Sequence, residues 1–190
     1  MPKRILYTRP DGGVDVCAPS HTAMRYMTGG GGRWDRIATR GFLDRQIAAQ
    51  AQHGVGERAA HRFVMAMHEG GCSTAEAYAV MRDRFCAHLG TGCELWDTED
   101  VPVDRWFRDA WRRSHNGGPI IVHLAKAKHL QWQRIKQTVT AHNAPRLALG
   151  RRPYVPLWGS LGNAIRHAKD VDQVRLVWPD VLISRPRSAV

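Results

Sequence analysis

Positively charged side chains gather in one part of the 190-residue chain. No aspartate or glutamate occurs in the sixty positions from 110 to 169, which hold eleven of the 28 basic residues. The rest of the chain holds 17 basic and 17 acidic residues, so this segment accounts for the net charge of +11. Phosphate groups neutralise such a surface and release counterions, so the pattern is typical of polyanion-binding proteins. A solvated basic surface that binds nothing is the alternative interpretation.

Aromatic rings lie among these cations, and flat rings beside cations can stack on unpaired bases. We therefore predict that the segment from 112 to 169 binds nucleic acid, either DNA or RNA, or a complex that contains it. Nothing in the sequence indicates that the protein recognises individual bases by their edges. The candidate binding residues are Arg112, Arg113, Lys126, Lys128, His129, Arg134, Lys136, Arg151, Arg152, Trp106, Trp132, Tyr154 and Trp158.

Cysteine and histidine spacing offers a weaker hint of metal chemistry. Cys86, His88 and Cys93 follow one another closely, with Cys72 upstream. Structural zinc sites normally use two closely spaced ligand pairs, and a second pair is missing here. The sequence also lacks a phosphate-binding loop of Walker type, a nucleophile elbow and a pair of catalytic carboxylates. We therefore predict no metal, no cofactor and no enzymatic activity, with the cysteines as reduced thiols.

The hydropathy of the chain bears on its location. The sequence contains no apolar run of the length that a signal peptide or a membrane-spanning helix requires. We therefore expect a cytoplasmic protein without a membrane partner, and a virion-associated location is the alternative.

Turn signals and apolar periodicity predict a helix-rich α+β fold. In this fold, several helices pack against an N-terminal β-hairpin and a small antiparallel sheet. Pro10, Asp11, Gly12 and Gly13 form the turn of the hairpin. Five segments are expected: the hairpin at 1–19, a flexible glycine-rich joint at 20–33, a helical pair at 34–68, a core α+β unit at 69–144, and a basic extension at 145–190.

The core unit should begin with a helix over 74–89, because Ser73 and Glu76 have capping-box spacing, and a brief strand at 93–97 should follow. In the stretch DVPVDRWFRDAW, the spacing of its apolar residues predicts a helix with one buried stripe. That stripe comprises Val103, Phe107, Ala110 and Trp111. Trp106 falls off the stripe, so it either stacks on a base or lies half-buried at the edge of the core.

The basic part of the chain should contain a buried strand at 119–124 and a helix over 124–144 that ends before Pro145. Its inward residues are Ala125, Trp132, Ile135 and Val139, and its outward residues are Lys126, His129, Gln133, Lys136 and Gln137. The tail should form a short helix at 161–168, a strand at 173–178 and a mobile end at 184–190.

Two stretches, YTRPDGGVDV and ELWDTEDVPVDRWFRDAWRRSHNGGPIIVHLAKAKHLQWQRI, resemble a family of small uncharacterised proteins encoded in bacterial phages and prophages. The resemblance covers the hairpin and about residues 69–137, and rests on the Pro-Asp-Gly-Gly turn and the VPxDRxFRxAW pattern. It implies a phage setting, often near tail genes, but no activity. Trp106 departs from the small polar residue usual there, and 34–68 and the tail after Pro145 look like additions.

The residues and the resemblance together predict a phage-type accessory protein that binds nucleic acid without catalysis. The first alternative is a virion or tail-assembly protein whose basic surface meets an acidic protein and whose helical pair contacts a phage structural protein. The second alternative is a host-takeover inhibitor of a nucleic-acid-dependent host system.

Overall fold

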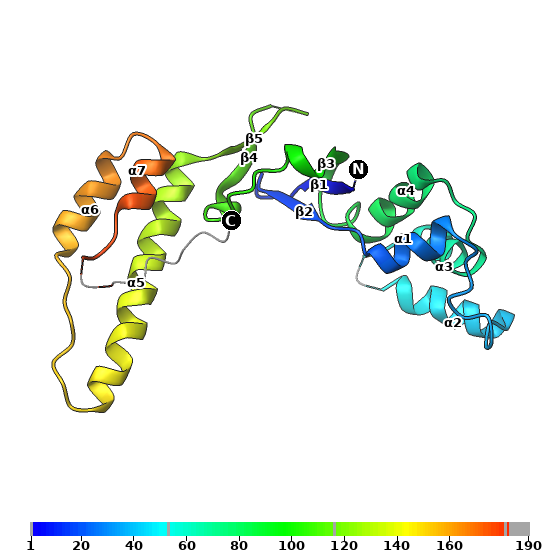
Figure 1. Ribbon diagram of the computed structural model, residues 1–190, viewed down its shortest axis with the longest axis horizontal. Helices are drawn as coiled ribbons and strands as arrows, with labels where there is room; N and C mark the ends of the chain where they lie inside the picture. The colour runs from blue at the N-terminus through cyan, green and yellow to red at the C-terminus, as the bar shows by residue number, and fades with distance from the viewer. Residues whose placement is uncertain (1, 53, 116, 181, 183–190) are drawn as a thin grey trace. The chain divides into compact units, whose positions relative to one another are not determined.

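The computed structural model describes residues 2–52, 54–115, 117–180 and 182, and the chain forms two compact units, Met1–Val101 and Pro102–Val190 (Figure 1). Helices and small antiparallel sheets together give a helix-rich α+β fold, as the sequence predicts. The boundary between the units falls inside the 69–144 segment, which therefore does not compact as one body. Below, unit 1 means residues 1–101 and unit 2 means residues 102–190.

Unit 1 contains a three-stranded antiparallel sheet in the order β2-β1-β3. Its strands are β1 (Lys3–Thr8), β2 (Val14–Cys17) and β3 (Thr91–Asp97). The predicted hairpin and the brief strand are both confirmed. Ile5 and Leu6 on the central strand are fully buried, so the sheet supplies part of the core of unit 1.

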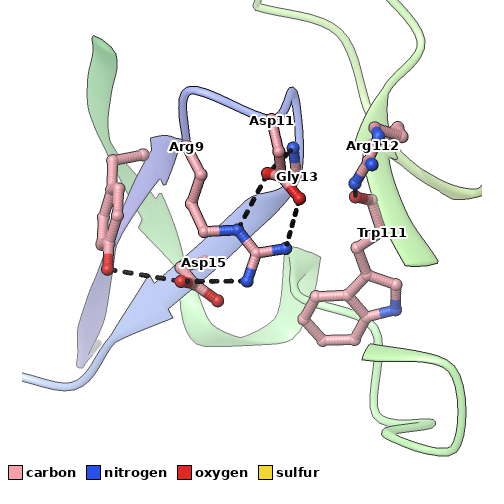
Figure 2. Close-up of polar contacts among 7 residues, drawn as sticks. Arg9, Asp11, Gly13, Asp15, Trp111 and Arg112 are labelled. Atoms are coloured by element: carbon pink, nitrogen blue, oxygen red, sulfur yellow. Dashed lines mark hydrogen bonds and ion pairs between the residues drawn. The ribbon is translucent and has the colours of Figure 1, made fainter. Parts of the chain in front are cut away.

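The Pro-Asp-Gly-Gly turn is held by Arg9 and two carboxylates (Figure 2). The Arg9 guanidinium pairs with Asp11 at 3.2 Å and with Asp15 at 3.5 Å. Gly12 has a φ of 76°, which favours glycine. A Cβ atom on Gly13 would lie 2.2 Å from a guanidinium nitrogen of Arg9. Both glycines therefore serve the geometry of the turn.

Unit 1 also contains four helices that pack on one another: α1 (His21–Thr28), α2 (Arg40–Gln50), α3 (Glu57–Glu69) and α4 (Thr74–Phe85). The predicted helical pair is present as α2 and α3. However, α2 begins at residue 40, because the Thr39 hydroxyl accepts a hydrogen bond from the Phe42 amide and caps the helix there. The capping box of Ser73 and Glu76 at the start of α4 is confirmed, and α4 ends four residues earlier than expected.

The predicted joint at 20–33 is wrong in two respects. Residues 21–28 form α1, which the Ser20 side chain caps. The glycines that follow meet the end of α3: the Gly32 amide donates to the His68 carbonyl at 2.7 Å, and the Gly71 amide donates to the Gly29 carbonyl at 2.8 Å. A Cβ on Gly70 would lie 2.2 Å from the Gly31 nitrogen. These glycines let two backbone segments approach closely, which is a packing role.

The stretch from 102 to 111 is not a helix. It forms a turn with the short 3-10 helix η2 (Arg108–Ala110), and Trp111 begins a strand. The Asp104 carboxylate accepts a hydrogen bond from the Trp106 amide at 2.9 Å, and this side-chain bond competes with helix formation. Phe107, Ala110 and Trp111 are buried as predicted, whereas Val103 is 72% exposed.

Unit 2 is organised around a long helix, α5 (Leu124–Ala148), with the shorter helices α6 and α7 alongside it (Figure 1). Its other elements are β4 (Trp111–Arg113), β5 (Ile120–Val122), α6 (Trp158–His167) and α7 (Val171–Leu176). The strand expected at 119–124 is present as β5, but Ile121 is 45% exposed, so the strand is not buried. The helix expected at 161–168 is present as α6, beginning three residues earlier.

Two further predictions in unit 2 are wrong. Pro145 lies inside the last turn of α5, so the helix continues three residues beyond the proline. Residues 171–176 form α7 in place of the predicted strand, because the Asp170 carboxylate caps the helix by accepting from the Gln173 amide at 2.8 Å. The mobile end predicted at 184–190 lies outside the described residues.

The core of unit 2 lies against one face of α5. The buried residues of that helix recur at every fourth position: Ala127, Gln131, Ile135 and Val139. Ile135 and Val139 were predicted to face inward, whereas Ala125 was also expected there and is exposed. Gln131 is fully buried; its amide donates to the Val177 carbonyl at 2.8 Å and accepts from the Trp106 indole at 3.0 Å.

Candidate nucleic-acid interface

The two units differ sharply in charge. Unit 1 contains twelve basic and twelve acidic residues, whereas unit 2 contains sixteen basic and five acidic residues. The whole net charge of +11 therefore belongs to unit 2. The candidate binding residues all lie in this unit, on β4, α5 and α6, in the turn before η2, and in the loop between α5 and α6.

Arg112 and Arg113 are half-buried on β4. The Arg112 guanidinium donates to the Trp111 carbonyl at 2.9 Å (Figure 2). Arg113 donates to the Gly118 carbonyl at 3.5 Å, across the turn that joins β4 to β5. These two arginines are thus held close to the two-stranded sheet rather than extended into solvent.

The outward face of α5 matches the prediction closely. His129, Gln133, Lys136 and Gln137 are exposed, and Lys126 is half-buried near the start of the helix. His129 and Gln133, one turn apart, form a hydrogen bond of 2.8 Å between their side chains. This face therefore offers two lysines, an imidazole and two amides to solvent.

Lys128 and Arg134 take a different direction from that outward face. The Lys128 ammonium donates to the Arg166 carbonyl in the last turn of α6 at 2.8 Å, which suits the negative end of a helix dipole. Arg134 is half-buried with its guanidinium 4.6 Å from the centre of the Trp106 ring. Burial lowers the pKa of Arg134, while the charge of Asp109 acts in the opposite direction. Both residues are tied to the packing of unit 2.

Trp106 occupies the edge of the core. Its ring is half-buried, meets Phe107 edge-on at 6.4 Å and Trp178 at 6.3 Å, and donates its indole N–H to Gln131. With Arg134 over one face, the ring is already engaged within unit 2. Of the two interpretations of Trp106 from the sequence, the structure therefore agrees with the half-buried ring at the edge of the core.

The other rings line the seam between α5 and α6. Trp132 and Trp158 meet edge-on with ring centres 5.4 Å apart, and both rings are half-buried. The exposed ammonium of Lys136 lies 5.5 Å from the centre of the Trp132 ring. A flat ring, a second ring and an exposed cation therefore lie together here, although the rings share in the packing.

The loop between α5 and α6 is fixed to the end of α5. The Asn143 side chain bonds both backbone groups of Tyr154, donating to its carbonyl at 2.8 Å and accepting from its amide at 2.7 Å. Arg146 donates to the Arg152 carbonyl at 3.1 Å. The side chains of Arg151 and Arg152 are exposed on this pinned loop. Two adjacent cations are thus held on a defined backbone.

Three cations outside the predicted set belong to the same acid-free segment. Arg166 and Lys169 are exposed at and just after the end of α6, and Arg146 is half-buried. The sequence feature that points to these three cations is the absence of acidic residues from 110 to 169.

The candidate metal ligands give no metal centre in the part of the chain that the structure describes, where no group of three or more histidine, cysteine or acidic residues could hold an ion. All four cysteines are free thiols in unit 1. A hydrogen bond with the Cys86 thiol lowers the pKa of Cys17 to about 7, and the charge of Arg4 acts in the same direction.

No family model, no curated protein and no solved structure matches this chain. Of the helices in the described residues, none combines the length and the apolar character needed to cross a bilayer.

Proposed function

We propose that this protein is a phage-type accessory protein that binds nucleic acid, without catalysing a reaction, through the basic surface of unit 2. The observation that carries the proposal is the partition of charge: unit 2 holds all of the net charge, and unit 1 holds none. A surface with sixteen basic and five acidic residues attracts a polyanion from a distance and gains free energy from counterion release on contact.

Many cations of unit 2 keep their charge uncompensated in the fold. In the described part of the chain, Lys128 and Arg146 bond to carbonyl oxygens and Lys136 lies on a ring. These neutral partners orient a cation without cancelling its charge. Arg151, Arg152, Arg166 and Lys169 are exposed, and none of them has an ion pair among the described residues. Such side chains can take phosphate oxygens as partners at little desolvation cost.

Backbone recognition rather than base recognition follows from this arrangement. Phosphate contacts fix the position of a protein on nucleic acid but carry no sequence information. The half-buried rings of Trp132, Tyr154 and Trp158 can add stacking only through their exposed edges and faces, so electrostatic attraction supplies most of the affinity. We therefore expect weak sequence preference and a strong dependence on salt.

The test is a salt series of fluorescence anisotropy with labelled duplex and single-stranded DNA and RNA. A variant with Lys136, Arg151, Arg152 and Lys169 all changed to Gln should lower the slope of log affinity against log salt by roughly three to four on duplex DNA, if each cation meets one phosphate. The affinity of this variant should fall by a similar factor for nucleic acids of every base sequence.

A matched control changes the same amount of charge in unit 1. Arg36, Arg40, Arg45 and Arg58 are also exposed, and changing all four to Gln alters the net charge of the protein equally. This control should bind like the unmodified protein. Equal losses in the two variants would mean that only net charge matters, and the absence of binding at low salt would overturn the proposal.

A specific observation favours one alternative, an assembly role with an acidic protein partner. Large aliphatic side chains are exposed near Arg151 and Arg152: Leu147 (58%), Leu149 (68%), Val155 (69%) and Leu157 (78%). Aliphatic groups gain more from a protein surface than from a phosphate backbone. Copurification with a phage structural protein that persists at high salt, together with no nucleic-acid binding, would support this alternative.

A further inference from the structure

Unit 1 contains a pocket that the proposed function does not use. The pocket has a volume of about 530 Å³, which lies within the range of small-molecule sites. It opens between α2 and the other three helices of unit 1, and all of its lining residues lie between positions 20 and 85. It is therefore a feature of one compact unit.

The pocket lies beside α2, which packs on α3 but buries none of its own residues. By contrast, α3 and α4 bury apolar side chains at regular intervals. The half-buried Leu43 and Ile47 pack against the core cluster that includes α3, while Gln46 and Gln50 line the pocket. The half-buried α2 therefore forms one wall of the pocket.

The floor of the pocket is aromatic and polarisable. It is formed by Trp34, Phe63, Met67, Met81 and Phe85. The rings of Phe63 and Phe85 meet edge-on at 5.4 Å, so they offer a guest one ring face and one ring edge, and the Arg84 guanidinium lies 4.8 Å from the centre of the Phe85 ring. Methionine side chains adapt to the shape of a guest and make favourable contacts with aromatic rings. This floor suits a flat aromatic group.

The rim of the pocket supplies a cation and amides but no acid. The guanidinium of Arg33 lies 5.7 Å from the centre of the Tyr26 ring and 5.9 Å from that of Trp34. Among the described residues, no carboxylate pairs with Arg33 and the Gln46 amide has no hydrogen-bond partner. The Gln50 oxygen accepts from Arg84 at 3.0 Å, which leaves the NH₂ group of Gln50 as a donor. The rim therefore offers donors to an anion.

From these features we propose that the pocket binds a small, flat aromatic molecule that carries an anionic group. The ring of the ligand lies on the Phe63 and Phe85 floor, and its anionic group accepts hydrogen bonds from Arg33 and Gln46. A neutral aromatic molecule of the same shape would lose the charge-assisted bond to Arg33 and should bind about tenfold more weakly.

The experiment uses 2-naphthoate and its neutral isostere 2-naphthamide with the full chain labelled with ¹³C at the methionine methyl groups. All six methionines lie in unit 1, so these signals report on that unit. Saturable shifts of the Met67 and Met81 signals, with Met65 much less affected, are expected, because Met65 does not line the pocket. The naphthoate affinity should exceed the naphthamide affinity about tenfold.

Matched variants test whether Arg33 causes the preference for the anionic probe. Arg33→Gln should reduce the difference between the two probes, mainly by weakening naphthoate binding, while Arg84 remains beside Phe85 and Gln50. Arg36→Gln, which removes an exposed arginine outside the pocket, should keep the difference. Gln46→Ala should weaken naphthoate binding even if Arg33→Gln does not fold. Equal affinities for the two probes, uniform shifts of all methionine signals, or no shifts at millimolar probe would overturn the proposal.

Discussion

The two units solve the problem of packing a small core in different ways. Unit 1 is neutral, buries apolar side chains from a sheet and three of its four helices, and uses glycines where two backbone segments approach closely. Unit 2 carries a net charge of +11, lies along one long helix, and places a buried glutamine and stacked arginines among its rings. Apolar side chains can pack in a core whether the surface is neutral or charged. A strongly basic unit, however, also needs partners for its many cations. Ring faces and carbonyl oxygens provide these partners in unit 2 without cancelling the charge.

The largest expected effect would separate the two units directly. Phe107 is buried in a cluster with Ala110, Ala127, Ala168 and Val174, so Phe107→Ala should destabilise unit 2 by about 3–5 kcal/mol. Five of the seven tryptophans belong to unit 2, so tryptophan fluorescence during urea unfolding should report this loss.

The reciprocal control for this prediction is Phe63→Ala, because Phe63 is buried in the core of unit 1. Unit 1 holds all four cysteines, and labelling of the buried Cys86 thiol should report its unfolding separately. If Phe107→Ala exposes Cys86 at the same urea concentration at which the fluorescence changes, the two units unfold as one and the comparison between them fails.

A smaller effect should appear at the glycine contact of unit 1. Gly70 and Gly71 have nearly equal φ angles, 73° and 74°, so alanine strains the backbone similarly at both positions. A Cβ on Gly70 would collide with Gly29 and Gly31, whereas a Cβ on Gly71 meets nothing within 4 Å. Gly70→Ala should therefore cost about 1–3 kcal/mol more than Gly71→Ala in thermal unfolding. Equal costs would mean that the close approach of the two backbones contributes nothing.

The same glycines show which parts of the fold can be predicted from sequence. The hairpin, α3 and the start of α4 follow from local signals: a turn with the right residues, apolar periodicity, and a capping box. The run of glycines from 29 to 32 carries a local signal for flexibility, but its structure depends on Gly70 and Gly71 some forty residues away. A contact of that kind leaves no pattern in either segment alone.

The helix predicted for the stretch from 102 to 111 is wrong for a different reason. The spacing of Phe107, Ala110 and Trp111 fits a helix, but it also fits a short turn that leads into a strand, and burial alone does not distinguish them. The hydrogen bond from the Trp106 amide to Asp104 is a local feature that favours the turn. At α7, by contrast, the sequence contains a local signal for a helix, because Asp170 and Gln173 have capping-box spacing.

The candidate interface was predictable in its charge and less so in its geometry. The acid-free segment and the exposed face of α5 are read directly from residue types and helical periodicity. The sequence does not show that Arg134 stacks on Trp106, or that Asn143 pins Tyr154, because both contacts depend on tertiary packing. Sequence therefore located the basic surface, and the fold decides which cations remain exposed on it.

The smallest expected effect sharpens the comparison at the buried amide of unit 2. Gln131→Leu fills the same space but leaves the Trp106 indole N–H and the Val177 carbonyl without their partner, which should cost about 1–2 kcal/mol in urea unfolding. Gln137→Leu, an exposed change on the same helix, should cost far less. Because Trp106 also carries Arg134 on its face, releasing the indole should free that arginine and raise the affinity of unit 2 for polyanions slightly. If Gln131→Leu instead stabilises unit 2, apolar packing would suffice there as it does in unit 1. The polar contacts would then serve only to place the cations.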